Sequence, residues 1–144
     1  MDAKHKFSDI HIDRDPQEYD QFVFVRGISG LLSANSIFTN VPHLVVHHSP
    51  DGFQFGYGGS GPADLALNIL EYTLASMGHT GENTNCYSGK CFLLAWKLHQ
   101  KFKWEMIATM HSAANSISYT DVVKWIESQI EYQDEEKRKT GRFF

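Results

Sequence analysis

Residues 52–70, GFQFGYGGSGPADLALNIL, pass from a glycine-rich stretch into a strongly apolar segment. Pro62 suits the first turn of a helix, because its missing N–H has no partner there, and Ser60 or Gly61 suits the N-cap position before it. Apolar side chains then cover most of the helix circumference over 62–77, which is typical of a helix buried on several sides. We therefore expect the central helix of the fold here.

Three polar residues interrupt this apolar helix at helical spacing. Asp64, Asn68 and Glu71 lie at i, i+4 and i+7 and share one face. Asp64 is interpreted as a carboxylate that complements the positive end of the helix, and Glu71 as a solvent-exposed residue. The alternative is that these two carboxylates form an acid–base pair.

Apolar runs predict short strands before this helix and more helices after it. The expected strands that precede it are 21–28 (QFVFVRGI), 43–48 (HLVVHH) and 53–55 (FQF), with a loop or weak hairpin over 29–42. The elements expected after it are a helix over 87–101, a strand from 104, and a final helix with N-cap options over 118–121 and with Val122, Ile126 and Ile130 facing the core.

The order of these elements predicts an α+β fold: a small antiparallel or mixed sheet packed by about three helices in a single compact domain. A chain of 144 residues that is 42% hydrophobic is long enough to bury such a core. We expect a flexible charged leader over 1–20, the domain over 21–138 and a C-terminal tail over 139–144.

Composition excludes several classes of protein. The net charge of −4 argues against nucleic acid as the main partner, since nucleic-acid binders carry a basic excess. No apolar run approaches the roughly 18 residues that cross a membrane, and the N-terminus has no apolar signal-peptide core, so a cytoplasmic protein is expected. Cys86 and Cys91 match neither a CxxC pair nor a zinc half-site, which favours reduced thiols.

The glycine stretch formally matches the dinucleotide fingerprint GxGxxG at Gly56, Gly58 and Gly61. That fingerprint needs a βαβ unit with an acidic residue after the second strand, about 20 residues on, where this chain has a turn-rich segment instead. A Walker A loop is excluded because Pro62 follows Gly61, and the same proline breaks the GxSxG elbow. A structural turn and a ligand-binding loop both remain open.

If the loop binds a ligand, its unpaired backbone N–H groups at a helix start would hold an anion. Pro62 and Asp64 count against this, because one lacks an N–H and the other adds negative charge. Tyr57 would stack on a base or cover the core, and Lys90, Lys97 and Lys101 would supply a second contact. The candidate ligand-binding residues are Phe55, Gly56, Tyr57, Gly58, Gly59, Ser60, Gly61 and Asp64.

The eight histidines form no metal-binding motif, so we expect no metal and no cofactor. Ser60 with a histidine such as His48 would make a nucleophile and base for a hydrolase. The sequence offers no means of choosing the partners of Ser60, and a non-enzymatic protein is favoured.

Residues 47–70, HHSPDGFQFGYGGSGPADLALNIL, together with 102–110, FKWEMIATM, resemble an uncharacterised family of bacteria, phages and other mobile elements. This is domain-of-unknown-function family 6166, whose hallmark is the GYGGSGPA motif. The resemblance extends from Phe22 to Ile130, with Phe55 in place of the usual tryptophan. It implies a small accessory protein in a phage or plasmid setting and implies no activity.

These observations favour a non-enzymatic accessory binding protein that counters host defence by binding a nucleotide-like or other anionic ligand at the glycine loop. The alternative is a protein–protein inhibitor of a host nuclease or defence effector. The second alternative is the small hydrolase built on Ser60. A homodimer is left open.

Overall fold

The computed structural model describes residues 14–26, 37–48 and 52–140. Its main sheet has three antiparallel strands, in which β1 lies between β2 and β5. The strand bounds are Gln21–Arg26 for β1, Ile37–Thr39 for β2 and Ala114–Ser118 for β5. A separate hairpin pairs β3, Asn83–Cys86, with β4, Gly89–Phe92.

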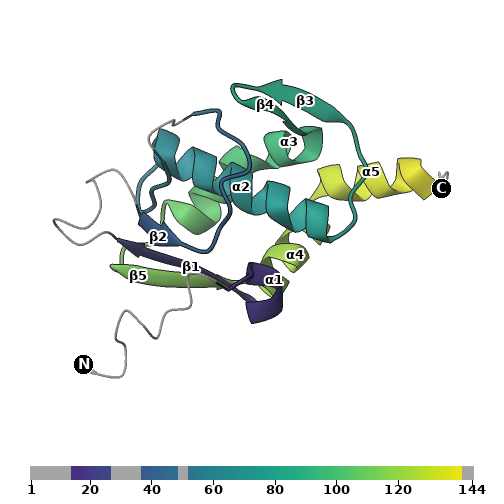
Figure 1. Cartoon of the computed structure of the whole chain (residues 1–144). Coiled ribbons are helices and arrows are strands. Elements are labelled where there is room, and N and C mark those ends of the chain that lie inside the picture. The colour runs from purple at the N-terminus through teal and green to yellow at the C-terminus, as the bar shows by residue number, and fades with distance from the viewer. Residues whose placement is uncertain (1–13, 27–36, 49–51, 141–144) are drawn as a thin grey trace.

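The described residues also form five α-helices and one π-helical turn, η2. Their bounds are Pro16–Tyr19 for α1, Ser60–Ser76 for α2, Leu93–Phe102 for α3, Lys103–Ile107 for η2, Tyr119–Glu127 for α4 and Ile130–Thr140 for α5. Helices α2 and α3 lie on one side of the main sheet, and the β3–β4 hairpin lies beyond them (Figure 1). The prediction of a single compact α+β domain is confirmed. No helix among the described residues is long and apolar enough to cross a membrane.

Helix α2 is the central helix that the sequence predicts. Every residue from 61 to 70 is buried. At its C-terminus Gly78 adopts φ 78°, and the N–H of His79 donates to Leu74 O at 3.0 Å, which closes the last turn. The predicted helix is therefore correct, but it begins at Ser60, so its N-cap is Gly59 and not Ser60 or Gly61.

Two predicted strands before α2 are wrong. Segments 43–48 and 53–55 form no strand, although they bury Val45, Phe53 and Phe55 in the core. The apolar residues of both segments therefore predicted correctly that these segments are buried, but not that they join no strand. The backbone of the first segment is bonded to side chains of α2 instead of to a neighbouring strand, as described below.

The helix predicted over 87–101 begins only at Leu93. Residues before it form the β3–β4 hairpin, in which Gly89 has φ 145°, a conformation that no helix contains. The two cysteines therefore lie on paired strands and not on a helix, and both are free thiols.

The strand predicted from 104 is also wrong. Residues 103–107 continue α3 as η2, where Ala108 N donates to Lys103 O at 2.8 Å. The segment is a π-helical turn that buries Ile107 and exposes Trp104. The third strand of the main sheet is β5, which sequence reasoning missed.

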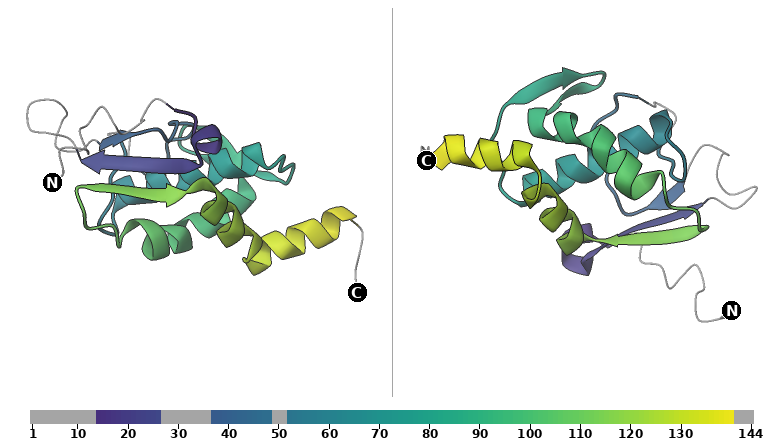
Figure 2. Two further views of the ribbon diagram at one scale, coloured as in Figure 1. Left: turned by 90° about the horizontal axis from the view of Figure 1, so that it is seen from below. Right: turned by 180° about the vertical axis from the view of Figure 1, so that it is seen from behind.

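The final helix is interrupted. Ser118 caps α4 by accepting a hydrogen bond from Asp121 N at 3.3 Å, and Val122 and Ile126 are buried as expected. Helix α4 ends before Ser128, and α5 projects from the body of the domain in a new direction (Figure 2). Ile130 is therefore exposed and does not face the core, contrary to the prediction.

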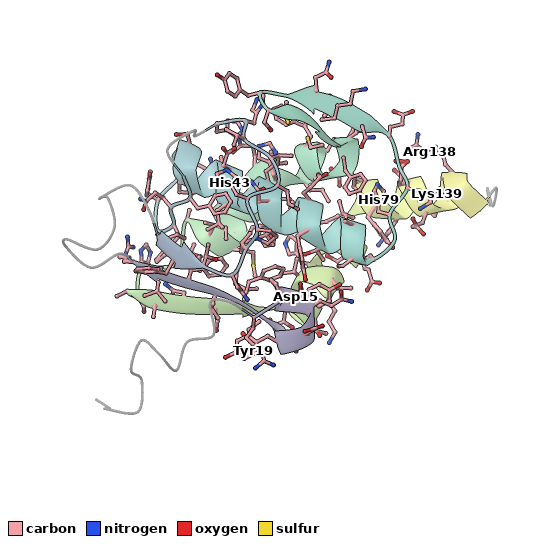
Figure 3. The ribbon with its side chains drawn as sticks, in the orientation of Figure 1. Asp15, Tyr19, His43, His79, Arg138 and Lys139 are labelled. Carbon is pink, nitrogen blue, oxygen red and sulfur yellow. The ribbon has the colours of Figure 1, made fainter. Side chains whose placement is uncertain are left out.

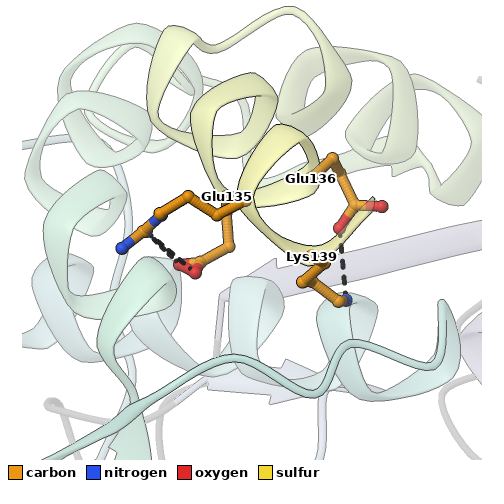
Figure 4. Close-up of polar contacts among 4 residues, drawn as sticks. Glu135, Glu136 and Lys139 are labelled. Atoms are coloured by element: carbon orange, nitrogen blue, oxygen red, sulfur yellow. Dashed lines mark hydrogen bonds and ion pairs between the residues drawn. The ribbon is translucent and has the colours of Figure 1, made fainter. Parts of the chain in front are cut away.

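Helix α5 carries two ion pairs along its own surface. Glu135 pairs with Arg138 at 2.8 Å and Glu136 with Lys139 at 3.2 Å (Figure 4). Surface i,i+3 pairs of this kind contribute only a few tenths of a kcal/mol. Helix α5 extends into the predicted tail as far as Thr140, and the rest of that tail lies outside the described residues.

The predicted leader lies partly outside the described residues, which begin at Arg14. Its last part forms α1, whose Pro16 is buried. The Tyr72 hydroxyl of α2 donates to Asp15 Oδ1 at 2.7 Å and accepts from Gln17 N at 3.0 Å. These contacts attach α1 to the central helix.

Candidate functional site

The polar residues of α2 bind the segment that precedes the glycine loop. Asn68 is fully buried, and its Oδ1 accepts hydrogen bonds from Leu44 N at 2.6 Å and Val45 N at 2.8 Å. Its Nδ2 donates to Val45 O at 2.8 Å. The side-chain amide thus takes the place that a neighbouring strand would occupy, which explains why residues 43–48 are extended in pattern but join no sheet.

Asp64 continues this arrangement one turn earlier. It is fully buried, and its carboxylate accepts hydrogen bonds from His48 N at 2.8 Å and from His47 N at 3.2 Å. Its carboxylate therefore holds the chain that leads to the loop. Hydrogen bonds from two N–H groups are the stabilisation that a buried carboxylate requires.

Glu71 is half-buried, so its interpretation as a solvent-exposed residue is wrong. Its Oε1 accepts a hydrogen bond from Phe92 N at 2.9 Å, which holds the end of β4 against α2. Burial raises the pKa of the Glu71 carboxyl group. Asp64 and Glu71 thus bind different backbone segments and do not form the acid–base pair considered from the sequence.

The glycine loop begins with a residue that only glycine suits. Gly56 has φ 88°, its N–H donates to Ile107 O at 3.0 Å, and a Cβ there would lie 2.8 Å from Met110 O. The Arg26 guanidinium group lies against it and stacks over the buried Phe55 ring, 4.4 Å from the ring centroid. This first loop amide is therefore occupied by the chain itself.

The next two loop glycines make room for aromatic rings. A Cβ on Gly58 would overlap the Trp104 indole, and a Cβ on Gly59 would overlap the Tyr57 ring. Both rings are nevertheless exposed, Tyr57 to 51% and Trp104 to 58%. The loop glycines thus leave room for two surface aromatic side chains to pack against the backbone.

A buried lysine lies under the same loop. Lys103 Nζ donates to Gly58 O at 3.0 Å and lies 4.4 Å from the centroid of the Trp104 ring. Desolvation lowers the pKa of Lys103. We call Arg26, Tyr57, Ser60 and Trp104, which are all exposed, the loop surface.

The three lysines expected to supply a second contact lie elsewhere. Lys101 Nζ donates to Gln129 Oε1 at 2.8 Å, and Lys90 lies on β4. Lys97 lines a hollow of about 480 Å³ between α3 and α5. The lysine that contacts the loop is Lys103, which lies in the FKWEMIATM stretch of the family resemblance.

A histidine pair lies close to Asp64. His48 Nε2 is 2.9 Å from His99 Nε2 of α3, and His99 Nδ1 is 2.6 Å from Trp96 O. Burial lowers the pKa of His99 to about 4 and also lowers the pKa of His48. The hydrogen bond of His48 Nε2 therefore goes to another imidazole and not to Ser60.

This pair was not predicted, because His48 and His99 are 51 residues apart and no spacing rule connects them. Within residues 14–26, 37–48 and 52–140, no group of three or more His, Cys, Asp or Glu side chains is arranged to hold a metal ion. His47 has a different partner, since its Nδ1 accepts a hydrogen bond from Tyr87 N at 3.1 Å.

The part of this chain that is similar in sequence to other proteins contains the glycine loop and the helix that follows it. Residues 31–84 match the model of a family of unknown function, DUF6166. The predicted resemblance is confirmed over these residues. Comparison with curated proteins and with solved structures gave no match.

The DUF6166 segment contains the loop, α2 and the chain that Asp64 and Asn68 bind. Arg26 and Trp104 of the loop surface, and Lys103 beneath it, lie outside the matched residues. The DUF6166 match thus covers the loop and its framework, while β1 contributes Arg26 and η2 contributes Lys103 and Trp104.

Proposed function

We propose that this chain is a non-enzymatic binding protein that contacts its partner through the loop surface. The observation that supports this most directly is the packing of Trp104 on Gly58 and of Tyr57 on Gly59. Aromatic rings that are exposed yet already fixed in position lose little conformational entropy on binding. Large aromatic side chains fixed in this way suit recognition.

The partner that this surface fits best is another protein. Tyrosine, tryptophan and arginine dominate the binding energy of protein interfaces, and Tyr57, Trp104 and Arg26 are grouped around one loop. In this proposal the partner is a host nuclease or defence effector in the cytoplasm, and the chain inhibits it. The phage or mobile-element setting comes from the family resemblance and not from the geometry.

A nucleotide-like anion is the second candidate, and Lys103 is the observation that favours it. This buried ammonium group lies beneath Gly58 at the N-terminal end of α2, where the helix dipole is positive. A base would stack on Trp104 or Tyr57 while a phosphate group took the positive end of the helix. Occupation of the Gly56 N–H by Ile107 O leaves fewer donors for this arrangement.

The protein-binding proposal is tested by capture of a host effector on the immobilised chain and on its Trp104→Ala and Tyr57→Ala variants. We expect both variants to retain their thermal unfolding temperature within a few degrees and to lose most of the captured effector. Tyr87→Ala is the matched control, because Tyr87 is more exposed, at 79%, and lies on the hairpin. Equal capture by the Trp104→Ala and Tyr87→Ala variants would refute the proposal that the partner binds at the loop surface.

Calorimetry separates the two candidates. Mono-, di- and cyclic nucleotides are titrated into the pure chain and into Lys103→Met, which keeps most of the length of the buried side chain but removes its charge. Heat that is lost in Lys103→Met supports the nucleotide candidate. Absence of heat with every nucleotide, together with effector capture that depends on Trp104, supports the protein partner.

A further inference from the structure

The Nε2 atoms of His48 and His99 lie 2.9 Å apart, the separation of two adjacent ligands on one metal ion. We propose that it binds a transition-metal ion of the class that prefers imidazole ligands in square-planar or octahedral geometry, Cu²⁺ or Ni²⁺. Neither the family match nor the loop surface assigns a role to these two residues, and the inference stands apart from the proposed function.

The hydrogen bonds of His99 decide which of its nitrogens is available. A carbonyl oxygen only accepts, so the contact of 2.6 Å with Trp96 O requires the proton on His99 Nδ1. His99 Nε2 then carries a lone pair directed at His48. Metal-binding histidines are commonly oriented by such a bond from the other ring nitrogen to a backbone carbonyl.

The distance between the two nitrogens fits a shared ion. Two ligands that are each about 2.0–2.1 Å from a metal and 2.9 Å from each other subtend an angle of about 90° at the metal. This is the angle between adjacent positions in square-planar and octahedral complexes, whereas a tetrahedral ion requires a wider separation. The geometry therefore favours Cu²⁺ or Ni²⁺ over Zn²⁺.

Both imidazoles are held in place before any ion arrives. His99 is only 2% exposed and packs against Trp96, with ring centroids 4.9 Å apart. His48 is half-buried, its N–H is bound by Asp64, and its ring is stacked parallel to the same indole at 6.0 Å. To share an ion, each ring must turn from its hydrogen-bond direction, because the ion lies off the line that joins the two Nε2 atoms.

Metal binding requires one change of tautomer. Without metal, His48 Nε2 must donate the hydrogen bond to His99 Nε2, because His99 Nδ1 already carries the ring proton of that residue. In the complex the His48 proton moves through solvent to Nδ1, and both Nε2 lone pairs bind the ion. No net proton is released in this exchange.

Among the described residues no third His, Cys, Asp or Glu joins the pair, so the remaining coordination positions belong to water or to an external ligand. Such a site binds more weakly and exchanges faster than a closed structural site with four protein ligands. It would leave the ion accessible from the half-exposed side of His48.

Trp96 provides a direct readout, because its ring contacts His47, His48 and His99. Titration of the chain with Cu²⁺ or Ni²⁺ is expected to quench the fluorescence of Trp96. The quenching should saturate when one ion is bound per chain. The electron paramagnetic resonance spectrum of the Cu²⁺ complex should show coupling to two imidazole nitrogens. Trp96→Phe should abolish the saturable quenching and leave the resonance spectrum unchanged.

The variants His48→Ala and His99→Gln are each expected to weaken binding at this site at least tenfold. His111→Ala is the matched control, because His111 is exposed and takes no part in the pair. Circular dichroism checks that each variant is folded. Unchanged Cu²⁺ affinity in His48→Ala, which removes the half-exposed ligand, would overturn the proposal, as would a resonance spectrum that lacks two-nitrogen coupling.

Discussion

The side chain of Asn68 and the backbone of Val45 form two hydrogen bonds with each other, both of 2.8 Å. Asn68 Oδ1 accepts from the Val45 N–H, and Asn68 Nδ2 donates to the Val45 carbonyl. A helix side chain therefore satisfies the backbone hydrogen-bonding groups of Val45 in the way that a neighbouring strand would. This contact positions the chain that enters the glycine loop.

Replacement of Asn68 should be among the most destabilising single changes in this chain. In Asn68→Leu the N–H groups of Leu44 and Val45 and the carbonyl of Val45 lose their partner, and each buried unsatisfied group costs about 1–3 kcal/mol. Urea unfolding should show a loss of at least about 3 kcal/mol. A loss below about 1 kcal/mol, similar to that of the exposed control Asn85→Ala, would contradict this role.

Gly58 and Trp104 should be energetically coupled. Gly58→Ala places a methyl group in the space of the indole, and because this ring is exposed and can shift, we expect a cost at or below the ~1–3 kcal/mol typical of overpacking in a core. In a Trp104→Ala background the same change should cost much less, because the indole is gone. A double-mutant cycle measured by thermal or urea unfolding gives the coupling, and additive effects of the two changes would disprove the packing argument.

His79 should reduce stability in the native chain. It is only 9% exposed, neither ring nitrogen has a hydrogen-bond partner, and it lies beside α5 (Figure 3). His79→Phe removes both unsatisfied nitrogens and keeps a ring against Phe92, so we expect an increase of about 1 kcal/mol in the free energy of unfolding at pH 7. A decrease of similar size would show that the imidazole makes a stabilising contact.

The same residue predicts a dependence on pH. Desolvation lowers the pKa of His79, Lys139 lowers it further, and Glu135 and Glu136 act in the opposite direction. The unfolded chain therefore takes up this proton first, and stability is lost as the pH falls below the ordinary histidine pKa of 6.5. Unfolding measured from pH 7.5 to 5 should show a smaller loss in His79→Phe than in the native chain.

Glu71→Gln should stabilise the chain at neutral pH. The amide oxygen of glutamine still accepts from Phe92 N, while the charge that burial disfavours is removed. Since the pKa of Glu71 is raised, its ionisation costs stability as the pH rises through that pKa, and the gain should shrink towards pH 4. Glu82→Gln, an exposed site, is the control and should change little. Destabilisation by Glu71→Gln at pH 7 would show that the carboxylate charge itself is needed.

The sequence by itself determined the elements whose signals are local. Apolar side chains around α2, Pro62 in its first turn and Gly78 at its end define a helix without reference to the rest of the chain. The Ser118 cap defines the start of α4 in the same way. These signals depend on residues a few positions apart, and for that reason they could be interpreted correctly.

Only the tertiary structure decided what the polar residues do and which distant side chains meet. Segment 43–48 has the residue pattern of a strand, yet its backbone forms hydrogen bonds with the side chains of Asp64 and Asn68. The sequence indicates that this segment is buried, but it does not indicate which group binds each buried N–H. In the same way, contacts such as Trp104 on Gly58 and His48 against His99 form only when packing brings α3 and η2 beside α2. The spacing of apolar residues indicates only which face of a local segment is buried away from water, whereas such contacts depend on how the whole chain packs.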